Sequence, residues 1–151
     1  MDVLLDPPFA KDPPVKLDIP AKTLGLILAI LGGIGAVLGL LGLIGVSAFA
    51  PAIGGGLLVI ATLVTLVGTA MTAWGGYQMY QEDRRGKRMV IYGLVVNTVG
   101  GLISVLAGTG LSGWIVNTLI DVVIYYLVVI SRYEDEPKLV GAAAPRPPEQ
   151  R

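Results

Sequence analysis

The chain has 151 residues, 54% of them hydrophobic and 15% charged, with a formal net charge of zero and a mean hydropathy of +0.73. This composition excludes an ordinary soluble domain and provides no overall charge for binding nucleic acid. The chain has no Cys and no His, which excludes disulfides, thiolate or imidazole metal ligands and most hydrolytic triads. We expect a membrane protein that is not an enzyme, needs no cofactor and does not bind nucleic acid.

The first segment, residues 1–21, is polar and rich in proline, and its sequences DPPFAK and DPPVKL are near-copies. Paired prolines favour an extended, stiff chain. The segment is predicted to be a cytoplasmic tail outside the folded domain, which we place at residues 22–132. Two interpretations stay open, a solvated tail and a docking arm for a partner.

Residues 23–81 contain no charged residue, a stretch too long for one membrane span of about 20 residues. The sequence SAFAPAIGGG, with Pro51 and three consecutive glycines, interrupts the apolar run. The pattern therefore predicts two membrane-spanning helices, at residues 23–46 and 52–80.

The next segment, QEDRRGKR at residues 81–88, is charged and predicts a loop with a tight turn at Gly86. Two further apolar stretches predict spans at residues 89–110 and 111–131, joined by a minimal turn. Residues 133–151 return to charge and proline and are predicted to be a disordered cytoplasmic tail.

The eleven Lys and Arg residues all lie before Thr23, within residues 81–88, or after residue 131. The positive-inside rule then places both termini and the 81–88 loop in the cytoplasm. The predicted fold is an all-α membrane protein, a bundle of four transmembrane helices forming two helical hairpins, N-in and C-in, in a plasma or inner membrane. The two outer loops are too short for an ectodomain, so we expect no soluble ligand there.

Small residues follow one side of several predicted spans, at the spacing that lets helix backbones approach closely in lipid. We expect these positions to form packing seams, with a threonine-lined permeation path as the alternative for the second span. The positions are Gly32, Gly35 and Gly39 in the first span, Thr62, Thr65, Thr69 and Thr72 in the second, and Gly100 and Gly101 in the third.

The third and fourth spans carry an intramembrane polar site, predicted to comprise Asp121, Asn117, Asn97, Ser104 and Tyr125. An acid is tolerated at this depth when it faces the bundle and accepts hydrogen bonds. A turn near residues 110–111 predicts three neighbouring sets: Asp121 with Gly100 and Gly101, Asn117 with Ser104, and Asn97 with Tyr125.

Asp121 has no Lys, Arg or His within the spans to pair with. Three roles stay open: an interhelical hydrogen-bonding group, a proton or cation relay, and a partner for a basic residue of another subunit. A separate basic group, Arg84, Arg85, Lys87 and Arg88, is a candidate site for anionic lipid headgroups, although topology signalling explains it equally well.

With no catalytic set and no cofactor ligand, the pattern favours a non-enzymatic accessory or assembly subunit of a membrane complex. The expected partners are the lipid bilayer and either other membrane subunits or further copies of the chain. The alternative function is a proton- or cation-coupled small transporter that acts as an oligomer, with Asp121 as the coupling residue.

Overall fold

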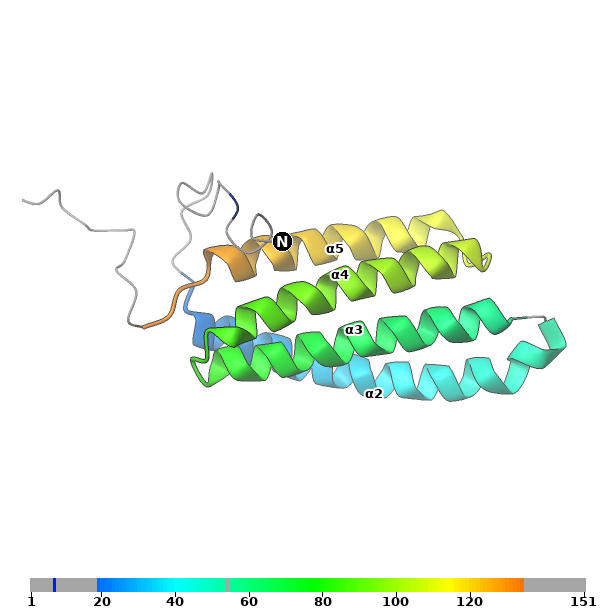
Figure 1. Ribbon diagram of the computed structural model, residues 1–151, viewed down its shortest axis with the longest axis horizontal. Helices are drawn as coiled ribbons and strands as arrows, with labels where there is room; N and C mark the ends of the chain where they lie inside the picture. Colours follow the sequence, from blue (N-terminus) through cyan, green and yellow to red (C-terminus); the bar gives the residue numbers. More distant parts are fainter. Residues whose placement is uncertain (1–6, 8–18, 54, 135–151) are drawn as a thin grey trace, which may run out of the picture.

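The computed structural model describes residue 7, residues 19–53 and residues 55–134, and within them it is all-helical apart from turns and one isolated bridge. Four long helices follow one another along the chain (Figure 1): α2 (Ala21–Ile53), α3 (Gly56–Tyr80), α4 (Arg85–Leu106) and α5 (Leu111–Ile130). Each is long and apolar enough to cross a membrane. The predicted four-helix membrane bundle is confirmed.

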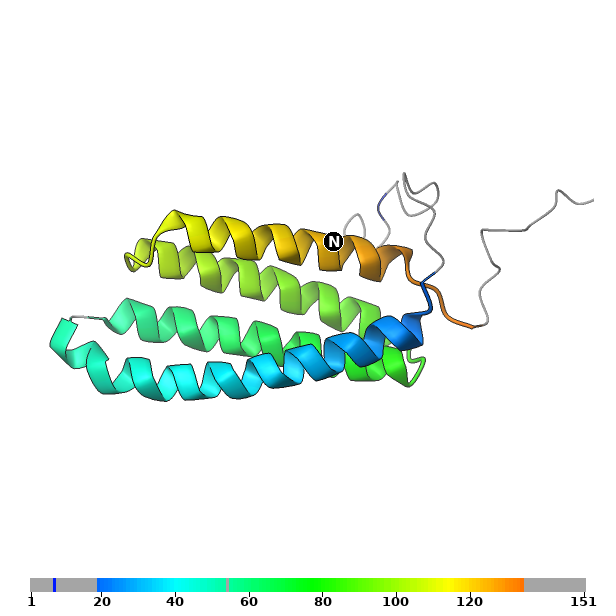
Figure 2. The same ribbon diagram turned by 180° about the vertical axis from the view of Figure 1, so that it is seen from behind.

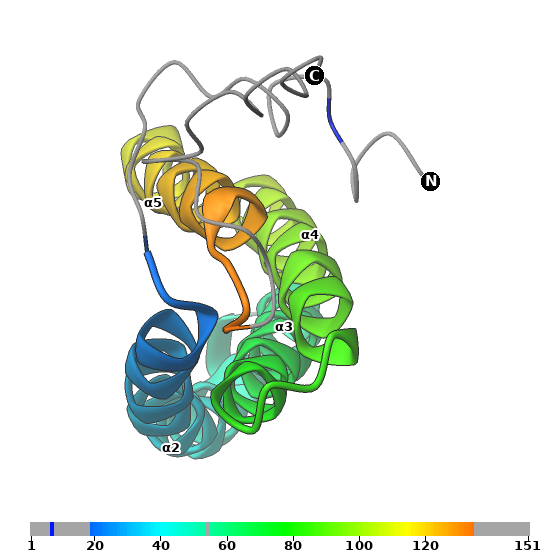
Figure 3. The same cartoon turned by 90° about the vertical axis from the view of Figure 1, so that its left-hand side faces the viewer.

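The helices form an arc in the order of the chain (Figure 3). The inner helices α3 and α4 pack on each other most extensively, and α2 packs almost as extensively on α3. By contrast, α5 makes far fewer contacts with α4 and hardly touches α2. Seen from behind, α3 and α4 are visible between α2 and α5 (Figure 2). The bundle is therefore built from a tight three-helix unit with α5 attached along one side.

One end of the bundle is closed and the other is more open. We call the end formed by residues 19–22, 80–87 and 130–133 the closed end, and the end formed by residues 53, 55–57 and 105–112 the open end. Most of the buried apolar cluster lies toward the closed end, including Ala21, Leu24, Leu28, Met79, Val90, Val128 and Tyr133. The hydrophobic packing is thus concentrated in one half of the bundle.

Backbone contacts tie the two ends of the described chain together at the closed end. The Ala21 nitrogen donates to the Arg132 carbonyl at 2.6 Å, and the Arg132 nitrogen donates to the Ile19 carbonyl at 2.9 Å. The segment after α5 then crosses the end of the bundle (Figure 3), where the buried Tyr133 hydroxyl donates to the Asp83 carbonyl at 3.1 Å. The chain thus enters and leaves the bundle at the same point.

Glycines set the distance between α3 and α4. A Cβ atom at Gly68 would lie 2.6 Å from the Asn97 nitrogen, and one at Gly93 would lie 2.7 Å from the Gly68 carbonyl oxygen. Gly75 and Gly86 meet in the same way, since a Cβ atom at Gly86 would lie 2.7 Å from the Gly75 carbonyl oxygen. Side chains at these positions would push the helices apart.

The glycines predicted as a seam in the first span lie on the side of α2 that faces α3. A Cβ atom at Gly32 would lie 2.9 Å from a Cα atom of α3. Gly35 and Gly39 have slightly more room, because their nearest neighbours are side-chain ends at 3.1 Å, the Thr69 Cγ2 and the Leu66 Cδ1.

The threonines of α3 do not form one seam. Thr69 faces α2, whereas Thr65 and Thr72 face α4, because α3 is the helix that packs on both neighbours. The hydroxyls of Thr62, Thr69 and Thr72 donate to the carbonyl four residues earlier at 2.8, 2.9 and 3.0 Å. These bonds satisfy the hydroxyls within the helix.

The first helix continues beyond its predicted end at residue 46 and includes Pro51, ending at Ile53. Proline lacks an N–H group and bends a helix without always ending it. Figure 1 shows the last turn of α2 bending toward the start of α3. The first helix thus ends at Ile53, and the next begins at Gly56.

The predicted turn at Gly86 is wrong. The turn occupies residues 81–84, with Glu82 at φ 62°, and Gly86 is buried inside α4, which begins at Arg85. The other end of α4 is also shifted, since it stops at Leu106 before a loop in which Gly108 and Gly110 have φ values of 93° and 89°. Glycine adopts this backbone conformation without steric cost, so the helix ends there.

The predicted tails, residues 1–21 and 133–151, lie mostly outside the described residues. At their inner edges, Pro20 forms a bridge with Arg132 and Ala21 begins α2. Tyr133 is 5% exposed and packs in the bundle, so the predicted tail boundary at residue 133 is too early.

Candidate intramembrane polar site

Asp121 is the eleventh of the 20 residues of α5 and thus lies midway along it. Its side chain is 7% exposed and faces α4. Asn97 Nδ2 donates to the two carboxyl oxygens at 3.4 and 3.2 Å, and Thr98 Oγ1 donates to Oδ2 at 3.2 Å. Within α5, Asn117 Nδ2 reaches Oδ2 at 3.5 Å. The structure therefore brings together three of the predicted polar residues and adds Thr98.

The hydrogen bonds to Asp121 are long. N–H···O hydrogen bonds usually measure about 2.7–3.2 Å, and the hydrogen bonds that described residues donate to this carboxyl measure 3.2–3.5 Å, at or beyond the long end of that range. Two nearby oxygens, Asn97 Oδ1 and Thr118 Oγ1, are buried without a hydrogen-bond partner in the described chain. The polar cluster therefore keeps unused hydrogen-bonding capacity within the described chain.

Thr98 and Trp114 belong to this site, although the sequence analysis did not include them. Trp114 Nε1 donates to the Thr98 carbonyl at 3.2 Å, and its ring lies over Gly101, where a Cβ atom would be 2.7 Å from Cδ1. Trp114 precedes Asp121 by two helical turns, and this spacing places both side chains on one face of α5. The seven-residue spacing is the feature of the sequence that could have indicated Trp114 as part of the site.

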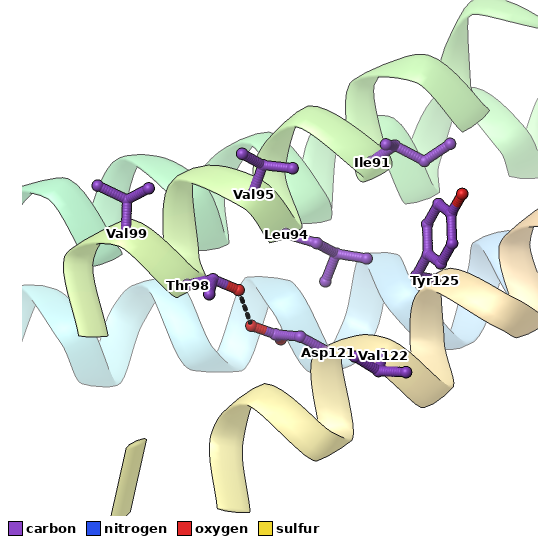
Figure 4. A pocket seen from close by; sticks show the side chains of 8 residues that line it. All are labelled: Ile91, Leu94, Val95, Thr98, Val99, Asp121, Val122 and Tyr125. Carbon is purple, nitrogen blue, oxygen red and sulfur yellow. Dashed lines mark hydrogen bonds between the residues drawn. The ribbon is translucent and has the colours of Figure 1, made fainter. Parts of the chain in front are cut away.

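A pocket of about 240 Å³ adjoins Asp121 between α4 and α5 (Figure 4). We call it the Asp121 groove. Its polar lining consists of Asp121 and Thr98, with the Tyr125 ring at one end (Figure 4), and its walls are otherwise aliphatic: Ile91, Leu94, Val95, Val99 and Val122. Val95, Val99 and Val122 are 46, 48 and 56% exposed at the outer surface, so the groove opens toward lipid.

A second hollow of about 430 Å³ runs along α5 itself, lined by Ser112, Gly113, Val116, Asn117 and Ile120. Asn117 therefore lies between this hollow and the carboxyl of Asp121.

The predicted register between the third and fourth spans is wrong by about one helical turn. Asp121 lies beside Asn97 and Thr98, whereas Gly100 faces the backbone of Thr65 in α3. The cause is the longer loop at residues 107–110, which moves the turn toward the start of the chain. A shift of one turn keeps the same face of the helix and changes only the depth.

Ser104 is not part of the site, because its hydroxyl donates to the Gly100 carbonyl of its own helix at 3.1 Å. Tyr125 lines the groove one turn beyond Asp121. Its predicted neighbour, Asn97, instead reaches the carboxyl itself.

The basic residues near the start of α4 differ from one another. Arg84, Arg85 and Arg88 are exposed, but Lys87 is half-buried at the closed end. Its Nζ donates to the Ser131 carbonyl and lies 5.0 Å from the centre of the Tyr133 ring. Lys87 therefore holds the segment after α5 in place, which weakens its case as a lipid-headgroup ligand.

The geometry defines the chemistry available at the site. Asp121 is the only acid between residues 89 and 131, and its neighbours are neutral amides and a hydroxyl. Such a carboxyl accepts hydrogen bonds, pairs with one cation or exchanges a proton. Comparison with protein-family models, curated proteins and solved structures finds no match.

Proposed function

We propose that this integral membrane protein is a non-enzymatic accessory or assembly subunit of a larger membrane complex, with both termini in the cytoplasm of a plasma or inner membrane. The one-sided Lys and Arg distribution supports the orientation. In this arrangement the closed end, with its basic residues, faces the cytoplasm.

The position of Asp121 on the least packed helix is the observation that carries this proposal. A carboxyl that served only to join helices of this chain would be most effective in the tight interface between α3 and α4. It lies instead on α5, whose packing on α4 is much less extensive. Exposed apolar side chains need no protein partner, because lipid tails are equally apolar. A carboxyl group at mid-membrane carries a free-energy cost, and on a helix with few packing contacts this cost favours binding to a further protein.

The alternative is a proton- or cation-coupled transporter with Asp121 as the coupling residue. The groove beside the carboxyl favours it. Its lining residues, however, lie within residues 91–99 of α4 and 121–125 of α5, short of both ends of the bundle. The groove therefore provides a place for a bound group rather than a route across the membrane.

The test is to purify the tagged protein from its native membranes in mild detergent after light cross-linking. An accessory subunit brings a second membrane protein in fixed stoichiometry, and deleting its gene lowers the amount of that assembled complex. The opposite result is a homogeneous protein that alone drives gradient-dependent flux in liposomes, with the flux lost in Asp121→Asn. That outcome would replace the accessory function with transport.

A further inference from the structure

The Asp121 carboxyl has no basic counterpart within the described spans. Residues 89–131 include no Lys, Arg or His, and the donors that reach the carboxyl are neutral. The basic residue nearest in sequence, Arg132, follows α5, roughly 16 Å along the helix axis at about 1.5 Å per residue. Among the residues that the structure describes, no basic side chain hydrogen-bonds to Asp121 or lies within the spans at its depth, so a cation carried there by a membrane helix comes from another molecule.

The Asp121 groove has the form of a socket for one long side chain. Its volume of about 240 Å³ falls below the range of about 300–1,000 Å³ that is typical of small-molecule sites. It opens through exposed aliphatic side chains of both α4 and α5. Exposed aliphatic side chains on both sides of a single carboxyl match a helix that inserts one residue.

A second copy of this chain does not supply that residue, because its Lys and Arg residues lie outside the apolar spans. A separate protein with a basic residue midway along a membrane helix does. A single charge at the centre of a helix costs about 2.5–3.5 kcal/mol on insertion scales. Pairing an acid with a base therefore relieves an unfavourable state in both proteins.

We propose that the Asp121 groove receives a lysine or arginine side chain from the membrane-spanning helix of a different protein. The ammonium or guanidinium group pairs with the Asp121 carboxyl, and its apolar stem lies against Val95 and Val122. Thr98 and Asn97 hold the carboxyl in place. This inference rests on the proposed accessory function and assigns the chemistry of its partner.

The test uses the full-length protein in phosphatidylcholine vesicles with a fluorescent Leu/Ala helix of about 20 residues. One probe peptide has a central Lys and its control has Leu at that position. Energy transfer from labelled protein should show about tenfold stronger association of the Lys peptide, equivalent to about 1.4 kcal/mol. Asp121→Asn should remove this preference, and Asp83→Asn, at the closed end, should leave it unchanged.

A second variant separates loss of the socket from loss of folding. Val122 is exposed at the groove, so Val122→Trp should fill the groove, keep the helical content and thermal transition, and abolish the Lys preference. Equal association of both peptides with the wild-type protein, or a preference that survives Asp121→Asn, would overturn the inference.

Dodecylamine tests the small-molecule alternative. Failure of the amine to displace the Lys peptide at equal membrane concentration supports a helix as the occupant, and displacement would replace the partner helix with a lipophilic amine. A negative peptide result together with a stoichiometric complex from native membranes would reject the socket and leave the accessory function intact.

Discussion

At the scale of single residues, the main feature is the Asp121 carboxyl, which accepts several hydrogen bonds that are all long. Asn97, Thr98 and Asn117 surround Asp121, and their hydrogen bonds to its carboxyl measure 3.2–3.5 Å. Hydrogen bonds between membrane helices contribute only about 0.6 kcal/mol on average. The role of Asp121 within this chain is therefore modest and measurable.

Replacing Asp121 tests that role directly. Asp121→Asn keeps the size and an oxygen acceptor, so the free energy of unfolding should change by less than about 1 kcal/mol. Asp121→Leu should lower it by about 1–3 kcal/mol, because buried donors lose their acceptor. Unfolding in mixed micelles with increasing sodium dodecyl sulfate measures both, with Leu119→Ala, at an exposed position, as the control. Equal losses in the Asn and Leu variants would contradict this account.

At the scale of elements, glycine contacts determine which helices pack tightly. Gly93 belongs to the interface between α3 and α4, and a Cβ atom there would lie 2.7 Å from backbone atoms of α3. Gly42 lies on the exposed side of α2, where a Cβ atom meets nothing within 4 Å. The two glycines are chemically identical but differ in the space beside them.

This difference gives a matched pair of variants. Gly93→Ala should lower the free energy of unfolding by about 1–3 kcal/mol, the usual cost of an overpacked interior. Gly42→Ala should leave it unchanged within about 0.5 kcal/mol, as for other surface substitutions. The same detergent titration measures both. Similar results for the two variants would show that the contact between α3 and α4 is not close.

The loop between α4 and α5 gives a second matched pair. Gly108 has a φ of 93° and open space around it, while Gly113 has open space in α5. Gly108→Ala should be destabilising by about 1–2 kcal/mol through backbone strain alone, whereas Gly113→Ala should not lower stability. Thermal unfolding followed by circular dichroism compares them. A neutral Gly108→Ala would place the end of α4 elsewhere.

At the scale of the whole molecule, the bundle is fastened at one end. The segments at Pro20 and Arg132 form a bridge, whereas α2 and α5 otherwise share few contacts. Since the chain contains no Cys, introduced cysteine pairs report directly on this arrangement.

A disulfide should form readily between Pro20→Cys and Arg132→Cys, which are bridge partners within reach of one another. A pair at Gly45→Cys and Ser112→Cys, toward the open end of α2 and α5, should remain reduced under the same mild oxidation. Gel mobility after oxidation at low protein concentration distinguishes the two. Rapid cross-linking of the second pair would show that α2 and α5 pack along their whole length.

The orientation of the molecule is tested with reporter fusions. Fusions after residue 85 and at the C-terminus should both report the cytoplasm, because the Lys and Arg residues lie on that side. Fusions near residues 54 and 109 should report the opposite side. An external signal from residue 85 would reverse the proposed topology.

The sequence by itself determined the class, the number of spans and the polar face of α5, because apolar length and charge distribution are local properties. It also indicated Asp121, Asn97 and Asn117 as members of one polar site, although it paired Asn97 with Tyr125 and not with Asp121. Only the tertiary structure decided their register, since that depends on where Gly108 ends α4. The tertiary structure also decided which helices pack on each other. Because α3 lies between α2 and α4, some of its threonines face one neighbour and some face the other. A stripe of small residues in the sequence shows only that one side of a helix can pack closely, and not on which helix.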